Sequence, residues 1–511
     1  FALQEAQLYQ GLLPFEYPIS KEFLRDHLNQ GQNVLAVQVH NQSTSSSDLS
    51  AIPFLSVAIA DTAHNYEPVP SWFVGEQLFT HTDFKINNGE ETVFLFHNDT
   101  TLVDKAGPAS LEFGHSTGRQ PDGSANWCIF NNPTPGFSNG AVTCFDDYEP
   151  APLFSLVPGF YNGTQTLTIS SPSPTSEIRV TVNGDFPTQN SPIYTGPIAI
   201  DSSMVVSARC FSNANLFPSP VEKNTYLIDE NNNNLPVVSL SLDSFDLWDV
   251  DSGINIFGTT YNSTFPHYGA NFWEEWERLA HIEYFNQNEQ HQFELDFSIK
   301  IHGGWSRAYD QKSFRVDTEG RLDGKIDFPI FSGRPNTVSY DNINLRNGGQ
   351  ENLHSRIQDA IVSRLVKNTH VDYMEYEPAI LFLNGAYWGL YGIREKMDEH
   401  YIESHYGVPS DEVDLLNRDN VLAGSDTGFV NMHDFITTVN PIDSGYYGQV
   451  DAMLDIENYC DYFAIETFIQ NKDWCGIAWG LNNVKIWRPQ QAGGKWRYML
   501  YDVDGAYGGF G

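Results

Sequence analysis

The sequence predicts a multidomain protein in which N-terminal all-β sandwich modules precede a C-terminal α+β domain. Its 511 residues exceed the ~250–300 at which a single hydrophobic core usually stops growing. Short alternating apolar runs, bounded by Gly, Pro and Asn, dominate up to about residue 229 and indicate antiparallel strands. From residue 235 onward, helical apolar periodicity is mixed with strand patterns, which favours an α+β fold there.

Composition excludes several classes of protein. Hydrophobic residues make up 41% and aromatic residues 14%, enough for folded cores, so the chain is not disordered. Lys and Arg number 28 against 65 Asp and Glu, a formal charge of −37, which repels nucleic acid and anionic membranes. We expect a solvated acidic surface that suits saline surroundings and divalent cations. No apolar run approaches the ~20 residues of a membrane span.

The chain ends and the cysteines indicate whether the protein is intracellular or extracellular. The first ten residues lack the basic start and apolar block of a signal peptide, and both ends are expected to continue into a longer protein. Cys128 and Cys144 flank a Pro/Gly/Asn-rich loop and can form a disulfide, which would favour an oxidising, extracellular setting. Cys460 and Cys475 are a second candidate pair, and Cys210 is expected to be a buried small hydrophobe. No Cys/His spacing indicates zinc, and His291 stands apart from the other histidines.

Two β-modules are expected before residue 149. Residues 1–64 contain the alternating run 33–40 (NVLAVQVH), and the segment resembles the closing part of a galactose-binding-like jelly roll. Residues 65–148 carry a turn at 87–89 between strands, then GRQPDG, a Trp and PTPG. This order resembles the later half of a lamin-tail-like domain, which is an immunoglobulin-type β-sandwich, so part of such a module is expected there.

A stiff linker at 149–152 leads to a third β-module at 153–229. Asn183-Gly184 and Pro187 punctuate its short strands, and the segment resembles the small β-sandwich at the end of chitobiases. We interpret it as a spacer, with glycan binding as the alternative. Residues 229–234, with four asparagines, form a second linker. The strands are expected at 166–169, 177–182 and 204–208.

Two helices are expected in the C-terminal domain, at 352–367 and at about 452–470. The first has one apolar face at helical spacing, and the second is largely apolar and aromatic, so it is expected to be buried. The first face comprises Leu353, Ile357, Ala360, Ile361 and Leu365, and the second helix contributes Leu454, Tyr459, Phe463 and Phe468.

A hairpin after the second helix predicts a cluster of polar side chains. Residues 483–487 and 495–501 read as its strands, and the second strand leads into Asp502-Val503-Asp504-Gly505. Because a hairpin brings its two ends together, Asp473, Asn482 or Asn483, and Asp502 should converge.

Such a cluster suits phosphoryl transfer, which needs hard oxygen ligands for Mg²⁺ and a carboxylate to orient the attacking hydroxyl. Protein kinases use the same chain order, yet Asp473 lies nine positions before Asn482 rather than five, and no His-Arg precedes it. The structural alternative makes Asp473 a helix-end cap and Asp502 a turn residue. The loop at Gly303-Gly304, with Lys312 on the next strand, can hold phosphate or can be an ordinary hairpin turn.

The long motifs of residues 235–511 resemble the CotH family of atypical kinases, named for a spore-coat protein. They are HGGWSR…QKSFR (302–315), NLRNGG (344–349), LFLNGAYWGLYGIREKMDEHYI (381–402), NKDW…NN (471–483) and KWRYMLYDVDGAYG (495–508). The resemblance implies a divergent protein-kinase-like fold that uses ATP with Mg²⁺ or Mn²⁺ to phosphorylate Ser or Thr of a protein.

Residue roles follow from the same resemblance. It implies that Asp473 is the catalytic carboxylate and that Lys312 contacts the phosphates. Arg346 is expected to pair with an acid or a phosphate, or to form a structural salt bridge with a residue such as Asp359. The other nucleotide contacts would be Gly303, Gly304, Arg307 and Glu395, and the metal ligands Asn483, Asp502 and Asp504, with Asn482 as a substitute.

Three functional classes remain open at the level of sequence. The first is a secreted or cell-surface bacterial enzyme that phosphorylates a protein substrate. The second is a non-catalytic structural or adhesive surface protein that binds other surface or matrix proteins and retains a kinase-like domain. The third is a carbohydrate-binding adhesin that recognises glycans through residues 1–230.

Overall fold

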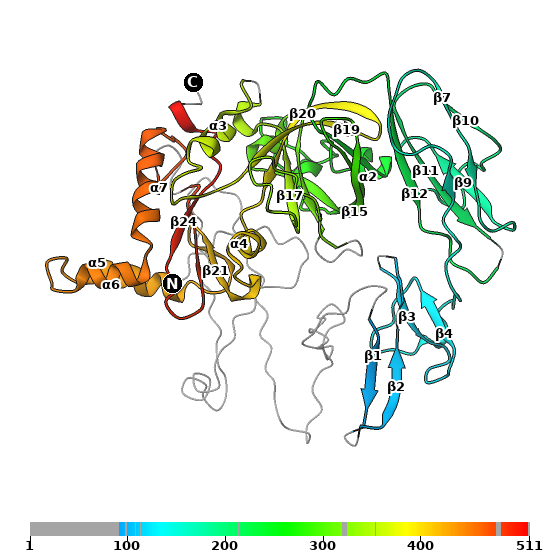
Figure 1. Ribbon diagram of the computed structural model, residues 1–511, viewed down its shortest axis with the longest axis horizontal. Helices are drawn as coiled ribbons and strands as arrows, with labels where there is room; N and C mark the ends of the chain where they lie inside the picture. Colours follow the sequence, from blue (N-terminus) through cyan, green and yellow to red (C-terminus); the bar gives the residue numbers. More distant parts are fainter. Residues whose placement is uncertain are drawn as a thin grey trace, which may run out of the picture. The chain divides into compact units, whose positions relative to one another are not determined.

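The computed structural model describes residues 91–511 apart from 98–99, 108, 113, 213, 319–323, 353, 477–481 and 509–511 (Figure 1). The described residues all belong to one compact unit, His81–Gly511. The strand predicted at 33–40, the turn predicted at 87–89 and Leu353 of the predicted helix lie outside the described residues.

The first described module is built from short antiparallel hairpins closed by a disulfide. β1 pairs with β2 and β3 pairs with β4. Cys128, in β4, is bonded to Cys144 with a Cα–Cα distance of 5.1 Å, which confirms the first candidate cysteine pair. The resemblance of this module to a lamin tail stays a prediction. Its strands are β1 (Val93–Phe96), β2 (Leu102–Ala106), β3 (Ser116–Arg119) and β4 (Trp127–Phe130).

The second module contains a four-stranded sheet in the order β6-β12-β11-β9, with two further strand pairs, β7–β10 and β5–β8. Branched and aromatic side chains such as Val206 and Tyr226 fill its core. Leu227 of β12 instead packs with Val237 and Phe285 of the domain that follows, so the two share buried surface. The strands are β5 (Leu153–Phe154), β6 (Gly159–Tyr161), β7 (Gln165–Leu167), β8 (Ile169–Ser170), β9 (Glu177–Thr181), β10 (Ile198–Ile200), β11 (Met204–Phe211) and β12 (Glu222–Ile228).

A closed barrel follows, in the order β13-β14-β15-β16-β17-β20-β19. β13 pairs antiparallel with β14 and parallel with β19, so the closed sheet has no free edge. Apolar side chains such as Leu240, Phe297 and Phe314 fill the interior. Its elements are β13 (Val237–Leu242), α2 (Ser244–Trp248), β14 (Arg278–Phe285), β15 (His291–His302), β16 (Ser313–Asp317), β17 (Asn342–Arg346), β19 (Tyr376–Leu383) and β20 (Ala386–Glu395).

The C-terminal part is a five-stranded sheet accompanied by helices (Figure 1). The predicted hairpin is present as β23 and β24, which pair antiparallel. The strand order is β18-β24-β23-β21-β22. The strands are β18 (Asp372–Tyr373), β21 (Val413–Asn417), β22 (Asn420–Ala423), β23 (Lys485–Pro489) and β24 (Arg497–Leu500), and the helices are α3 (Gln358–Leu365), α4 (Glu399–Tyr406), α5 (Thr427–Thr438), α6 (Tyr446–Met453) and α7 (Ile456–Phe468).

The prediction that the first helix packs through its apolar face is wrong. α3 begins at Gln358, after a 3₁₀ turn at Gly349–Glu351, and Ala360 is buried. Three apolar residues of the predicted face are exposed instead: Ile357, Ile361 and Leu365. The opposite face packs instead, because Val362 and Val366 lie in a hydrophobic core and the carboxylate of Asp359 forms ion pairs with two arginines of the barrel.

The prediction that α7 is a buried aromatic helix is also wrong. Phe463 and Phe468 are 48% and 78% exposed, and Tyr459 is exposed as well. The helix buries Tyr462 with two polar residues, Asn458 and Glu466. These polar side chains form hydrogen bonds to the chain around them, so apolar content alone did not identify the packed face.

The second candidate disulfide is absent, because Cys460 and Cys475 are free and exposed, whereas Cys210 is free and buried as expected. Thiol titration checks this arrangement. We expect the denatured, unreduced protein to show three reactive thiols and the reduced protein all five cysteines. A single reactive thiol before reduction would establish the Cys460–Cys475 bond and contradict the structure.

Candidate active site

Asp473 lies in a tight loop immediately after α7. Asn471, fully buried, donates to Glu466 at 2.9 Å, and its own side-chain oxygen accepts from the backbone N–H of Asp473 at 3.1 Å. The neighbouring Lys472 N–H donates to the carbonyl of Gly505 at 3.2 Å. The loop is therefore fixed both to its own helix and to the segment that follows β24.

The first end of the hairpin contacts Asp473 directly, and the second end is joined to it through Asn483. Asn482 donates to Asp473 Oδ1 at 2.7 Å and Asn483 donates to Asp473 Oδ2 at 3.1 Å. The amide nitrogen of Asn483 also donates to the carbonyl of Asp502 at 3.2 Å. Asn483 and Asp502 both have left-handed backbones, with φ of 51° and 53°. Strain of this kind in non-glycine residues concentrates at functional sites.

Arg346, at the end of β17, contacts carboxylates from two other parts of the chain. Its guanidinium forms ion pairs with Asp502, with Asp504 at 2.9 Å and with Asp359 at 3.2 Å. Both alternatives predicted for Arg346, pairing with the acids of the site and a salt bridge with Asp359, therefore occur together. Asp504 is buried and also accepts a hydrogen bond from the backbone N–H of Gln350 at 2.9 Å. Burial and the nearby Asp502 raise the pKa of Asp504 to about 7, although Arg346 opposes the shift.

The glycine-rich loop lies between β15 and β16 and reaches the carboxylates through Tyr309. Gly303 has a φ of +110°, and a Cβ there would lie 2.5 Å from the Ser306 hydroxyl, so the turn requires glycine. Gly304 is exposed. The Tyr309 hydroxyl donates to Gln350 at 3.2 Å, and Gln350 in turn binds Asp504.

The two cations predicted to bind phosphate already have partners in the protein. Arg307 donates to the carbonyl of Gly303 at 2.6 Å and pairs with Glu275 at 2.6 Å. Lys312 is buried, and its ammonium donates to the carbonyls of Arg307 and Tyr309 at 3.1 and 2.9 Å. Burial lowers the pKa of Lys312 to about 8. The predicted roles of Arg307 and Lys312 in phosphate binding stay predictions. The contacts of Lys312 with two carbonyls stabilise the conformation of the loop.

Glu395 ends β20, where the chain leaves the barrel. It is buried, forms an ion pair with Arg334 at 2.8 Å and contacts His405 at 2.7 Å. Burial alone would raise its pKa, but His405 and Arg334 together lower it. Glu395 also lines a small polar pocket with Lys396 and His400. The pocket lies at the predicted connection, and contact with nucleotide remains a prediction.

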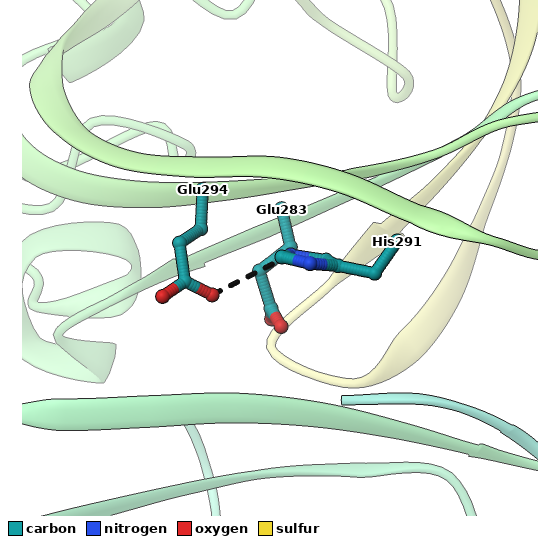
Figure 2. Close-up of side chains that lie close together, drawn as sticks. All are labelled: Glu283, His291 and Glu294. Atoms are coloured by element: carbon teal, nitrogen blue, oxygen red, sulfur yellow. Dashed lines mark ion pairs between the residues drawn. The ribbon is translucent and has the colours of Figure 1, made fainter. Parts of the chain in front are cut away.

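A second cluster lies on the outside of the barrel, where Glu283, His291 and Glu294 place ligand atoms within 4.8 Å of one another (Figure 2). Sequence reading missed it because the β14–β15 register shifts by one residue next to Phe285, which brings His291 beside the acids. His291 lies 3.4 Å from Glu294. The buried Glu283 accepts from the Thr225 N–H at 3.1 Å and from the Thr225 hydroxyl. Both of its oxygens are thus used to join β12 to the barrel, and we assign the cluster to that contact.

Comparison with known protein families shows that the C-terminal domain matches a kinase-related family. Residues 299–511 match the family model described as CotH kinase protein, and residues 156–221 match the one described as chitobiase/beta-hexosaminidase C-terminal domain. None of the curated proteins compared with the chain matches it. The chain therefore carries a CotH kinase domain and a chitobiase C-terminal-like domain, which confirms these two resemblances.

The CotH match includes every residue of the predicted site, from the glycine-rich loop to Asp504. In the part of the chain that the structure describes, no helix has the length and apolar character needed to cross a membrane.

Glu283 predicts a pH dependence of stability. Burial raises its pKa from 4.5 to about 7, so the folded state binds the proton more tightly than the unfolded state. Its contribution favours folding at low pH and is lost as the pH rises through about 7. We expect Glu283→Gln to raise the free energy of unfolding at pH 8 by about 1–3 kcal/mol and to leave it nearly unchanged at pH 5.

Denaturant unfolding at both pH values checks this expectation. Glu289→Gln, at an exposed position in the turn between β14 and β15, serves as the control and should change neither value. Equal stabilisation by Glu283→Gln at pH 5 and pH 8 would show that Glu283 is not protonated in the folded protein.

Proposed function

We propose that the C-terminal domain is an ATP- and Mg²⁺-dependent kinase that transfers the γ-phosphoryl group to a Ser or Thr hydroxyl of a protein. One observation carries the proposal: the amide of Asn483 donates both to the carboxylate of Asp473 and to the backbone carbonyl of Asp502, in the chain order that protein kinases use. The match to the CotH kinase family supports it.

Asp473 is the residue that would orient the acceptor hydroxyl and accept its proton. Two asparagine amides donate to its oxygens, which holds the carboxylate in one orientation. A carboxylate fixed in this way positions the hydroxyl before reaction, and proton transfer to such a group accelerates typical reactions by about 10²–10⁴-fold.

The residues after β24 fit a divalent cation. Asp502, with its side chain 38% exposed, and the buried Asp504 supply carboxylate oxygens. Asn483 donates from its amide nitrogen, which leaves the carbonyl oxygen as a third hard ligand. Oxygen ligands of this kind suit Mg²⁺ or Mn²⁺, which would neutralise charge on the nucleotide phosphates. When no metal ion is bound, Arg346 neutralises the same carboxylates.

Arg346 also supports the second candidate function, a non-catalytic surface protein. Its ion pairs with Asp502 and Asp504 satisfy both candidate metal ligands without a cation, as a structural relic of a kinase would. The Cys128–Cys144 disulfide favours an oxidising environment for either function, so we propose an extracellular or cell-surface location.

Phosphate transfer from γ-labelled ATP, either to the protein itself or to a mixture of Ser/Thr peptides, tests the proposal. We expect Asp473→Asn and Asp502→Asn each to reduce the rate by at least about 10²-fold, because they remove the acceptor carboxylate and a metal ligand. Asp461→Asn is the matched control, since Asp461 is 37% exposed and pairs with His370 away from this cluster.

The two candidate functions differ in their outcomes. The enzymatic function is supported if phosphate transfer depends on Mg²⁺, is lost in Asp473→Asn and Asp502→Asn, and is kept in Asp461→Asn. No transfer by the wild type, with no change in its melting temperature on addition of ATP and Mg²⁺ or Mn²⁺, would establish the non-catalytic function.

A further inference from the structure

Exposed aromatic side chains gather beside the barrel, where residues 252–273, between α2 and β14, meet the glycine-rich loop. Trp305, in that loop, and Tyr268 are each 53% exposed. Large apolar side chains that gather in contact with water usually mark a binding site. We name this group the aromatic surface, and its members are Phe257, Tyr261, Phe265, Tyr268 and Trp305.

The rings of the aromatic surface are in contact with one another across both segments. His267 lies among them, and its ring centroid is 5.0 Å from that of Phe257, 6.2 Å from Tyr261 and 6.0 Å from Phe265. Phe265 in turn lies 6.0 Å from Trp305 of the glycine-rich loop. The exposed rings are therefore one continuous surface and not scattered single residues.

The segment that carries most of these rings is fixed to the barrel. Ile254 and Phe272, near its two ends, are buried in the barrel core. The buried side chain of Asn271 donates to two carbonyls of the preceding chain at 3.3 and 3.1 Å. Across the segment, the backbone N–H of Asn262 donates to the carbonyl of Tyr268 at 2.8 Å. Because the rings are already held in place, a ligand that stacks on them meets little entropic cost of ordering the protein.

The composition of the segment favours a ligand without charge. Residues 252–273 contain no Asp, Glu, Lys or Arg, although 18% of the whole chain is charged and its net charge is −37. A surface that recognises a charged ligand carries charge of the opposite sign. None of the aliphatic side chains of this segment is exposed, whereas its exposed polar residues are all neutral hydrogen-bonding groups: Thr259, Thr260, Asn262, Ser263 and Thr264.

The cation at the border of the aromatic surface does not change this conclusion. The guanidinium of Arg307 lies 5.9 Å from the ring of Trp273. Its nitrogens donate to the carbonyls of Gly303 and Trp273 and pair with Glu275 at 2.6 Å. Its charge is therefore already balanced within the protein.

A sugar has the two chemical features that such a surface matches. The C–H groups of a pyranose ring form apolar faces that stack on aromatic rings, and its hydroxyl groups form hydrogen bonds with amides and hydroxyls. Asn262 accepts from the backbone N–H of Thr264 through its side-chain oxygen at 2.8 Å, which leaves its amide nitrogen to donate to a ligand.

We propose that the aromatic surface binds a neutral polysaccharide, whose pyranose rings stack on Trp305, Tyr268 and the rings between them. Hydrogen bonds from the neighbouring threonines, serine and Asn262 would fix the hydroxyl groups of the sugars. This places glycan recognition in the barrel and not in residues 1–230, and it does not depend on phosphoryl transfer.

Calorimetric titration of the full chain with cellohexaose, chitohexaose and an anionic hexamer of galacturonic acid tests the proposal. We expect a neutral hexasaccharide to bind the wild type. Trp305→Ala and Tyr268→Ala should each weaken this binding at least about tenfold, because each removes an aromatic anchor from the surface. Both side chains are exposed, so equal melting temperatures should show that the variants fold. Tyr447→Ala, at a 69% exposed tyrosine of α6, is the matched control and should bind as the wild type does.

Three results would overturn the proposal. The first is that neither neutral hexasaccharide binds, and the second is that only the galacturonic acid hexamer binds, since charge would then decide recognition. The third is that a neutral hexasaccharide binds equally to the wild type and both variants, since the sugar would then lie elsewhere. If no sugar binds and sedimentation shows a wild-type dimer that Trp305→Ala makes monomeric, the aromatic surface is an interface between two copies of the chain. Sugar binding that depends on Trp305 and Tyr268, in a protein that transfers no phosphate, supports this proposal and removes only the kinase.

Discussion

The contact of Arg346 with three carboxylates is the interaction on which the rest of the C-terminal domain depends. It joins the end of barrel strand β17 to α3 through Asp359 and to the segment after β24 through Asp502 and Asp504. Asp359 and Asp504 are the buried partners, and removal of one partner from a buried ion pair leaves an uncompensated charge and costs about 3–5 kcal/mol. The same contact fixes the candidate metal ligands relative to the hairpin, so stability and site geometry have one origin.

Charges in the C-terminal domain are matched locally, although the chain as a whole is strongly acidic. The formal charge of −37 disfavours anions over the surface as a whole. Arg346 pairs with three carboxylates, and Arg394 pairs with one of them, Asp359. Lys312 is held by carbonyls of the glycine-rich loop.

Sequence reasoning predicted what depends on local chain geometry. The β23–β24 hairpin placed Asp473, Asn483 and Asp502 together, and the Cys128–Cys144 bond spans a loop rich in turn residues. It failed where tertiary contacts decide. Asp359 turns α3 away from its apolar face, polar partners orient α7, and the irregular register of β14 and β15 brings His291 beside Glu283. Arg346, Arg356 and Arg394 line one small pocket, and no local pattern in the sequence encodes their proximity.

The position of the metal in a crystal of the protein grown with Mn²⁺ and a non-hydrolysable ATP analogue tests the candidate active site most directly. We expect an anomalous peak bound by Asp502 and by Asn483 or Asp504, with Asp473 beside the terminal phosphate. A peak at Glu283, His291 and Glu294, or nucleotide bound away from the hairpin ends, would contradict it.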